Sequence, residues 1–517
     1  MTMEQRTGII DIGSNSIRLV VYEQYEDDAY RIVDESKSSA RLSAKTGSDG
    51  TLAQQDLDAV VETLAHFKRL SEAHRVTKLL AVATAAVRNA ANSAEALAYL
   101  RQSSGIDIRV LSGEAEARYG FIGMINTIDV EDGFLIDIGG GSTELSLFLR
   151  RKLVHSVSFP FGAVNTSKQW TIEGSADPTA LEGIRRLVQN ALAACPWAAG
   201  LPGLPLIGLG GTIRSIGKID QRRRGYSLQL AHRYEIGRPT FGALLHELAP
   251  LAPAQRKKVD GIDKQRADLI VAGLAIVQAI ADTLDASVCI VSGSGLRDGL
   301  FFETLRPGQP VLDDVLEHSV RNLLALHPSV PVPHVEQVKR IALRLFAGLS
   351  RQRSAAAAAL EKYLSTAALL YRIGVSVQYY QYERHTFYLM ANARIDGLTH
   401  REIVLCALVA SFQSSKKSRR LYMQHKDMLS EDDFLLATRL GALLRLAIAL
   451  DRSETQPIAG MSAALEGGEL RLALAYRHYP SIELKELADM DGEFEKTWGC
   501  KLMLRATPQE EATWLPL

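Results

Sequence analysis

Two short turns of small residues each carry an aspartate at the end of an apolar strand pattern. The first turn reads Asp11-Ile-Gly-Ser-Asn-Ser16 and the second reads Asp137-Ile-Gly-Gly-Gly-Ser-Thr143. Glycines let the backbone bend so that successive N–H groups converge on an anion, and the hydroxyls add further donors. The aspartate oxygens can hold a hard cation. The turns are therefore candidates for binding a phosphate with a metal ion, although a tight hairpin also explains either turn alone.

Two further turns of small residues come at the carboxyl ends of apolar strand patterns, where ligands bind in α/β sheets. They read Gly208-Leu-Gly-Gly-Thr212 and Ser292-Gly-Ser-Gly-Leu-Arg-Asp298, and all four turns could surround one cleft. Arg18 and Arg88 stand beside strand ends, where each could bind phosphate or form a surface salt bridge. The turn residues that we predict to contact phosphate are Gly13, Ser14, Asn15, Ser16, Gly139, Gly140, Gly141, Ser142, Thr143, Gly210, Gly211 and Thr212.

Acidic side chains also stand near these turns. Ser112 is a candidate N-cap for a helix whose first turn contains Glu114 and Glu116. Because these two acids are two residues apart, they point to nearly opposite sides of the helix, and only one of them can face the cleft. Compensation of the helix dipole is the alternative role for both. A third acid, Glu144, follows the second glycine turn.

An internal repeat indicates how these residues are positioned. The segment from Gly8 to Val21 recurs from Phe134 to Leu147, and each copy reads as a buried strand, the Asp-Ile-Gly turn and an alternating strand. The repeat predicts two related α/β domains, residues 1–127 and 128–305, whose turns face each other across a cleft. Helical patterns occupy residues 54–73 and 114–126 in the first domain, and 179–194 and 264–284 in the second.

The sequence changes character after the linker-like segment Arg306-Pro-Gly-Gln-Pro310. Alternation over residues 469–476 later returns to a strand pattern. We therefore expect an all-α domain over residues 306–451 and a small α+β domain over residues 452–517. The helical patterns of the all-α domain cover residues 335–348, 355–373, 399–410 and 431–450.

Composition is that of an ordinary soluble globular protein. Among 517 residues, 59 Lys and Arg balance 59 Asp and Glu, which argues against a molecule-wide nucleic-acid footprint and leaves local basic patches open. The four cysteines are too far apart for a disulfide framework or a zinc site. Prolines and glycines break the charge-free stretch from Leu187 to Ile213, and the N-terminus has no apolar signal core. We therefore expect a cytoplasmic protein that binds no membrane.

A series of motifs in the family's order, over residues 7 to 303, identifies a specific resemblance. The chain resembles the exopolyphosphatase / guanosine pentaphosphate phosphatase family, within the superfamily of actin, sugar kinases and heat-shock ATPases. The motifs are DIGSNSIRLVVYE (Asp11 to Glu23), ATAAVRNAAN (Ala83 to Asn92), LSGEAEARYGF (Leu111 to Phe121), LIDIGGGSTEL (Leu135 to Leu145), FPFGAVNTS (Phe159 to Ser167), GLGGTIRSIG (Gly208 to Gly217), RADLIVAGLAI (Arg266 to Ile276) and SGSGLRDGLFFE (Ser292 to Glu303).

The resemblance implies two duplicated actin-like (ribonuclease-H-like) domains around a cleft that removes terminal phosphates with the help of Mg²⁺. It implies that Glu116 is the general base, with Glu144 as a second acidic contributor to catalysis. The family's motif arginine corresponds to Arg88, and its phosphate-binding glycines and serine fall on the second turn. Asp137 is the expected Mg²⁺ carboxylate, and Asp11 takes the equivalent place in the first turn.

Residues 306–451 take the place of the HD-type helical domain of the family's long members. Where such a domain has a His-Asp or His-Glu pair and a later Tyr-His-Arg-Lys, this chain reads Leu369-Leu-Tyr-Arg-Ile-Gly374 and Ser411-Phe-Gln-Ser-Ser-Lys-Lys417. His385 remains alone, whereas a metallophosphatase needs clustered ligands. We therefore expect a degenerate HD-like domain that carries no hydrolytic metal. Its basic residues are either phosphate contacts or a solvated face: Lys416, Lys417, Arg419 and Arg420.

Together with the resemblance, these residues predict an exopolyphosphatase that releases orthophosphate from the ends of inorganic polyphosphate by Mg²⁺-assisted attack of water. The alternatives are hydrolysis of guanosine pentaphosphate at its 5′ end, a kinase of the same superfamily, and a non-catalytic polyphosphate or nucleotide sensor. The resemblance also implies a homodimer, and we expect no nucleic-acid partner.

Overall fold

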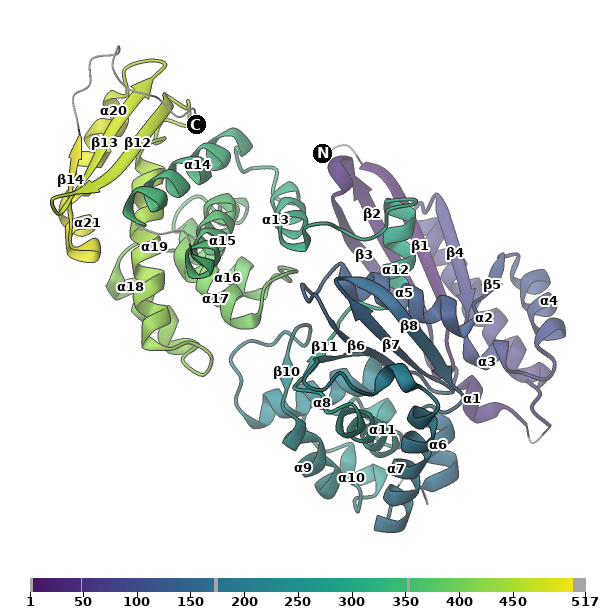
Figure 1. Cartoon of the computed structure of the whole chain (residues 1–517). Coiled ribbons are helices and arrows are strands. Elements are labelled where there is room, and N and C mark those ends of the chain that lie inside the picture. Colours follow the sequence, from purple (N-terminus) through teal and green to yellow (C-terminus); the bar gives the residue numbers. More distant parts are fainter. Residues whose placement is uncertain (1–2, 48, 172–174, 351–353, 505–517) are drawn as a thin grey trace. The chain divides into compact units, whose positions relative to one another are not determined.

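A computed structural model describes residues 3–47, 49–171, 175–350 and 354–504 (Figure 1). The chain divides into two compact units, Met1–Val315 and Leu316–Leu517. No helix in the described part of the chain is long and apolar enough to cross a membrane.

The first unit contains two sheets with the same topology. Their strand orders are β3-β2-β1-β4-β5 and β8-β7-β6-β9-β11-β10. In each sheet an antiparallel meander of three strands continues into two parallel strands, and the second sheet adds the short antiparallel strand β10. The strands are β1 (Met3–Ile12), β2 (Ile17–Tyr25), β3 (Tyr30–Ser38), β4 (Lys78–Ala83), β5 (Ile108–Val110), β6 (Gly133–Ile138), β7 (Thr143–Leu149), β8 (Lys152–Phe159), β9 (Leu206–Leu209), β10 (Glu235–Ile236) and β11 (Cys289–Val291).

Helices pack against these sheets through buried apolar side chains. With the first sheet come α1 (Leu42–Lys45), α2 (Gln54–Ala73), α3 (Ala85–Arg88) and α4 (Ser93–Ser104), whereas α5 (Gly113–Ile125) packs against β6, β7 and β8 of the second sheet. With the second come α6 (Ala163–Trp170), α7 (Pro178–Ala193), α8 (Gly210–Arg223), α9 (Arg238–Leu248), α10 (Pro253–Arg256) and α11 (Ile270–Thr283). The repeated strand order confirms the two related α/β domains that the internal repeat predicts, in the actin-like fold that the resemblance implies.

Helix α12 (Leu296–Leu305) follows the second sheet in the chain and packs on elements of the first. Its Phe301 ring stacks on Tyr22 of β2, with ring centroids 3.9 Å apart. A Cβ added at Gly299 would lie 1.9 Å from the Tyr119 carbonyl oxygen of α5, so only glycine permits this close approach. The predicted second domain ends with α12, and the structure places this helix in a buried apolar cluster that includes side chains of both sheets.

The second unit is mainly helical and ends in a small three-stranded sheet of order β12-β13-β14 (Figure 1). Helix α13 (Val315–Ala325) leads into this unit. Its helices are α14 (Val332–Leu349), α15 (Ala355–Leu370), α16 (Tyr382–Asn392), α17 (His400–Ala410), α18 (Ser415–Gln424), α19 (Glu431–Ala449), α20 (Ser481–Ala488) and α21 (Asp491–Trp498). Its strands are β12 (Ile458–Glu466), β13 (Glu469–Tyr476) and β14 (Lys501–Leu504).

Candidate active site

The two Asp-Ile-Gly turns are hairpins of the same design. Gly13 N donates to Ser16 O at 3.2 Å, and Gly139 N donates to Ser142 O at 3.0 Å. The turns also lie against each other, because a Cβ added at Gly140 would be 2.9 Å from Ser14 Cβ. Glycine at this position therefore lets the two lobes of the first unit meet at their candidate phosphate-binding turns.

A polar cleft of about 150 Å³ lies where the turns meet. It brings together residues from both lobes and from all four glycine turns. The predicted site residues that line it are Asp11, Gly13, Ser14, Asn15, Ser16, Glu116, Asp137, Gly139, Gly140, Ser142, Gly210 and Gly211.

Two predicted phosphate ligands have other contacts. The Thr143 hydroxyl donates to Phe161 O at 2.7 Å, inside the core of the second lobe. Thr212 packs against α11, where a Cβ on Gly273 would lie 2.7 Å from its methyl carbon. Both side chains are almost fully buried, and neither lines the cleft. Both side chains point into the second lobe, and their assignment as phosphate ligands stays a prediction. Gly141 also lies outside the cleft lining, beside Ser14 and Ser43 of the first lobe.

Glu116 faces the cleft from the first turn of α5. Ser112 caps this helix, accepting a hydrogen bond from Ala115 N at 3.1 Å. The side chain of Glu114, two residues earlier, is exposed. Burial and the charge of Glu144 raise the pKa of Glu116 well above the usual glutamate range, and the Arg88 guanidinium partly offsets this. A carboxylate with a raised pKa is suited to accept a proton near neutral pH.

Arg88 holds the Glu116 carboxylate in place. Its Nη1 donates to Glu116 Oε2 at 2.8 Å and to the Leu111 carbonyl oxygen at 2.9 Å. Arg88 does not line the cleft, and its assignment to phosphate remains a prediction. The contacts that the structure gives it are those of a positioning residue for Glu116.

Two further carboxylates, Asp11 and Asp137, line the cleft, whereas Glu144 is buried outside its lining. Burial and the charge of Asp11 raise the pKa of Asp137 to about 6. Burial and the charge of Asp137 raise the pKa of Glu144 to about 7. Glu144 pairs with Asp137 in the β6–β7 register and accepts a hydrogen bond from the Ser158 hydroxyl at 2.7 Å. The mutual repulsion of these acids would be relieved by a cation.

Asp11 and Asp137 form a donor set that fits Mg²⁺, which takes one or two carboxylates and completes its shell with water and phosphate oxygens. Within the described ranges, no three His, Cys, Asp or Glu side chains gather as an all-protein metal site. Two carboxylates beside an open cleft therefore match a cation that binds together with a phosphate.

Four arginines line the same cleft: Arg18, Arg214, Arg266 and Arg297. Burial and the positive charges of Arg297 and Arg214 lower the pKa of Arg18 to about 10. Gly211 makes room for Arg266, because a Cβ there would lie 2.1 Å from the guanidinium carbon. Sequence reasoning left Arg18 ambiguous and gave the other three no role. The available signal was an arginine that follows the glycines of three of the four turns within a few residues.

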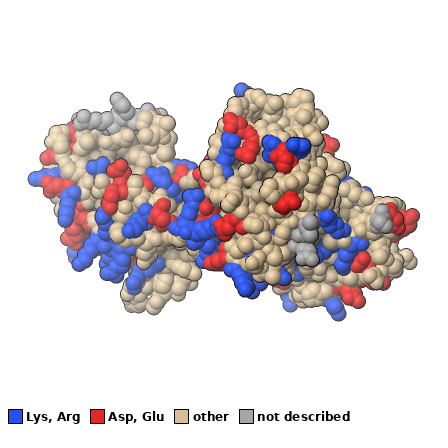
Figure 2. All heavy atoms as spheres, turned by 90° about the horizontal axis from the view of Figure 1, so that it is seen from below, with Lys and Arg blue, Asp and Glu red and all other residues tan. Residues whose placement is uncertain are grey.

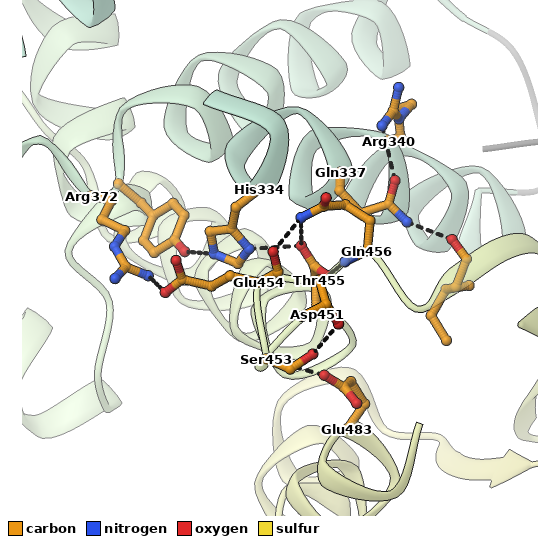
Figure 3. Close-up of polar contacts among 12 residues, drawn as sticks. His334, Gln337, Arg340, Arg372, Asp451, Ser453, Glu454, Thr455, Gln456 and Glu483 are labelled. Atoms are coloured by element: carbon orange, nitrogen blue, oxygen red, sulfur yellow. Dashed lines mark hydrogen bonds and ion pairs between the residues drawn. The ribbon is translucent and has the colours of Figure 1, made fainter. Parts of the chain in front are cut away.

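The place predicted for a degenerate HD site holds a buried polar network (Figure 3). His334 Nδ1 hydrogen-bonds Asp451 Oδ2 at 2.7 Å, and His334 Nε2 hydrogen-bonds the Tyr371 hydroxyl. Arg372, beside Tyr371, pairs with Glu454. The histidine in this network is His334, whereas His385, which the sequence singled out, lies on α16. These contacts tie α14 and α15 to the end of α19.

Two lobes of matching strand order, a small-residue turn from each, and the partly buried carboxylate of Glu116 in the cleft between them define an actin-like enzyme built to handle phosphate. Residues 20–307 match the Ppx/GppA phosphatase family, and residues 315–491 match domain III of Ppx/GppA phosphatases. The chain therefore belongs to the Ppx/GppA phosphatase family and is an enzyme.

Individual proteins similar to this chain are members of the same family. Exopolyphosphatase 1 of Mycobacterium leprae is 27% identical over 305 residues, which are 58% of this chain and 89% of the relative. The crystal structure of an Aquifex aeolicus family member is 25% identical, with a TM-score of 0.51, over 57% of this chain and 96% of that one. An exopolyphosphatase structure from Cytophaga hutchinsonii, at 22% identity and a TM-score of 0.55 over 58% of this chain and 98% of its own, supports the fold.

Proposed function

We propose that this enzyme is an exopolyphosphatase that releases orthophosphate from the ends of inorganic polyphosphate. The observation that carries the proposal is that Arg18, Arg214, Arg266 and Arg297 line the cleft that holds Glu116. Four guanidinium groups provide charge and hydrogen bonds for several consecutive phosphoryl groups. The substrate named for the Mycobacterium leprae relative supports the same choice.

Glu116 is the proposed general base. Its carboxylate accepts a proton from a water molecule while the water oxygen forms a bond to the terminal phosphorus. The bridging P–O bond breaks, and the bridging oxygen keeps the bonding electrons on the shortened chain. A positioned base contributes about 10²–10⁴-fold to such a step. Backbone N–H groups of the turns and the four arginines stabilise the charge on the phosphoryl oxygens.

Asp11 and Asp137 are the proposed holders of Mg²⁺. When bound, the ion neutralises charge on the phosphoryl oxygens. Glu144 is buried next to Asp137 on the neighbouring strand and accepts a hydrogen bond from Ser158. We propose that its carboxylate adds negative charge beside the cation site. The turn glycines Gly13, Gly139 and Gly140 remain the proposed contacts to the terminal phosphate.

Guanosine pentaphosphate hydrolysis is the alternative within the family. Among the described residues that line the cleft there is no aromatic side chain on which a guanine base could stack. This lining favours a substrate made of phosphate alone. Steady-state phosphate release from polyphosphate and from guanosine pentaphosphate, measured side by side, tests the choice. We expect kcat/KM to be at least about tenfold higher for polyphosphate, and a preference for the nucleotide would contradict the proposal.

The resemblance supports further proposals on organisation. We propose that the enzyme is a cytoplasmic homodimer, that its domains meet near residues 127, 305 and 451, and that residues 306–451 descend from an HD-type domain. Light scattering of the purified chain tests the dimer, because a monomeric mass at micromolar concentration would contradict it.

A further inference from the structure

A groove on the second unit is lined by the start of α16, the end of α17 and one side of α18. Its volume is about 780 Å³. Glu383 is the one carboxylate among the described residues that line it, against four cations. The lining residues are Gln381, Glu383, Arg384, Ser411, Gln413, Lys416, Lys417, Ser418, Arg420, Leu421 and Gln424.

None of the four groove cations, within the described ranges, forms an ion pair with a carboxylate. Arg384 Nη1 donates to Gln381 Oε1 at 2.8 Å, and Lys417 donates to Gln413. Arg419 lies between Lys417 and Arg420 on α18 but is neutralised. It pairs with Glu431 at 2.6 Å and lies over the Phe434 ring. Lys and Arg side chains gather on this unit in Figure 2. The groove therefore keeps a positive charge that the protein itself does not neutralise.

Two exposed tyrosines flank, along the chain, the residues of α16 that line the groove. Tyr380 directly precedes Gln381 and is 75% exposed, and Tyr388 is 66% exposed. Because Tyr388 follows Arg384 by one helical turn, the two side chains share a face of α16. The neighbouring Phe387 packs against His425 at the end of α18, with ring centroids 5.7 Å apart. Both tyrosine rings are thus open to solvent and stand close in the chain to residues that line the groove, although neither ring is part of its lining.

We propose that this groove binds a single-stranded nucleic acid, with the phosphates on the cations and bases stacked on Tyr380 and Tyr388. A positive groove that follows the backbone, beside aromatic rings that stack bases, is the arrangement by which proteins hold single strands without strong sequence preference. The glutamine amides and serine hydroxyls of the groove add donors and acceptors for base edges. Polyphosphate could bind the cations of the groove, but it has no aromatic ring that could stack on the tyrosines as a base does. The neutral net charge of the chain excludes only a molecule-wide footprint.

Fluorescence anisotropy of a labelled 12-nucleotide oligouridylate with the full-length enzyme tests the proposal. Tyr380→Ala and Tyr388→Ala should each weaken binding roughly tenfold, as loss of one stacked base does. Combined Lys416→Gln, Lys417→Gln and Arg420→Gln should lower the slope of log affinity against log salt by about 2, at ~0.7 per phosphate contact. Tyr479→Ala, an equally exposed tyrosine beside Tyr476, and Arg419→Gln are matched controls and should change affinity less than about twofold.

Two outcomes overturn the proposal. If the tyrosine variants bind the oligonucleotide as the unaltered enzyme does while the triple variant does not, the groove recognises a phosphate polyanion and not a nucleic acid. If the triple variant binds with unchanged affinity and salt dependence, the oligonucleotide lies elsewhere, such as in the arginine-lined cleft. The Tm of every variant in thermal unfolding should equal that of the unaltered enzyme, which shows that each variant has folded and keeps the test independent of the proposed hydrolase function.

Discussion

Glu116 and Glu114 differ in exposure although they lie two residues apart at the start of α5. Glu116 lines the cleft against Arg88, and Glu114 is exposed. Glu116→Gln preserves the shape of the side chain and removes its proton acceptor. We expect kcat for polyphosphate to fall by about 10²-fold or more with KM little changed. Glu114→Gln is the matched control, and a dead Glu114→Gln beside an active Glu116→Gln would show that the base is assigned to the wrong carboxylate.

The Arg88–Glu116 ion pair predicts a pH dependence. The base acts when it is deprotonated, so activity is lost as the pH falls through its raised pKa. Because the Arg88 guanidinium opposes the upward shift of the Glu116 pKa, Arg88→Gln should move the acid limb of kcat to higher pH. Arg88→Lys keeps the charge and should restore most of the profile. An unmoved acid limb in Arg88→Gln would remove Arg88 from this positioning role.

At the scale of residues, the sequence predicted the carboxylates better than the cations. Because Glu114 and Glu116 are two residues apart, they point to nearly opposite sides of any helix. The sequence therefore predicted that only one of them faces the cleft. The role of Arg266 depends on a contact with Gly211, which is far away in the chain, and local pattern carries no such information. The directions of the turn threonines were not predictable, because a short side chain reaches only its immediate neighbours in space: the Thr143 hydroxyl bonds Phe161 O in the second lobe.

Elements with a strong apolar period were predicted closely. The pattern over residues 54–73 coincides with α2 (Gln54–Ala73), and 469–476 coincides with β13 (Glu469–Tyr476). The predicted helix over 264–284 is divided in the structure. A short 3-10 turn, Lys264–Arg266, precedes α11 and is capped by Asp263, whose carboxylate accepts from Gln265 N at 3.0 Å. Arg266 lies in this short turn and lines the cleft. The helical pattern of the sequence continues through residue 266 and therefore did not predict the break.

The contact between the start of α8 and this 3-10 turn makes a further prediction. Gly211→Ala would place a methyl group against the Arg266 guanidinium, the movable end of a long side chain. We expect Arg266 to shift and KM for polyphosphate to rise roughly tenfold while the enzyme remains folded. Gly237→Ala is the matched control, because its nearest neighbour, Pro239 Cδ, would lie 3.8 Å from the new carbon. Equal kinetics in both variants would argue against a substrate contact of Arg266.

At the scale of the whole molecule, we expect the buried network around His334 and Asp451 to stabilise the second unit and to take no part in catalysis. Asp451 accepts a hydrogen bond from Gln456 N at 2.8 Å and hydrogen-bonds His334 (Figure 3). The side chains of Asp451 and His334 are both fully buried. Asp451→Ala leaves these partners unsatisfied, which costs about 1–3 kcal/mol. Thermal unfolding should show a lower Tm for the second unit, and the exposed Asp432→Ala should not. Unchanged unfolding in Asp451→Ala would contradict a structural role.

The division of the chain into α/β and helical parts was predictable from the repeat and from the change of periodicity near residue 306. The packing of α12 against α5 was not, because it rests on close approaches at Gly123 and Gly299 that are specified only in three dimensions. The same limit applies to the basic groove. The sequence places Lys416 to Arg420 together, whereas only the fold separates the paired Arg419 from its unpaired neighbours.

Isotope tracing of the released phosphate tests the central claim most directly. Polyphosphate hydrolysed by this enzyme in oxygen-18 water should yield orthophosphate that carries a single solvent oxygen, detected by mass spectrometry, while the remaining chains shorten from their ends. This result follows from attack of a Glu116-activated water on the terminal phosphorus. Release of no orthophosphate, orthophosphate without solvent oxygen, or transfer of phosphate only to an added acceptor would contradict the assignment of the cleft as an exopolyphosphatase site.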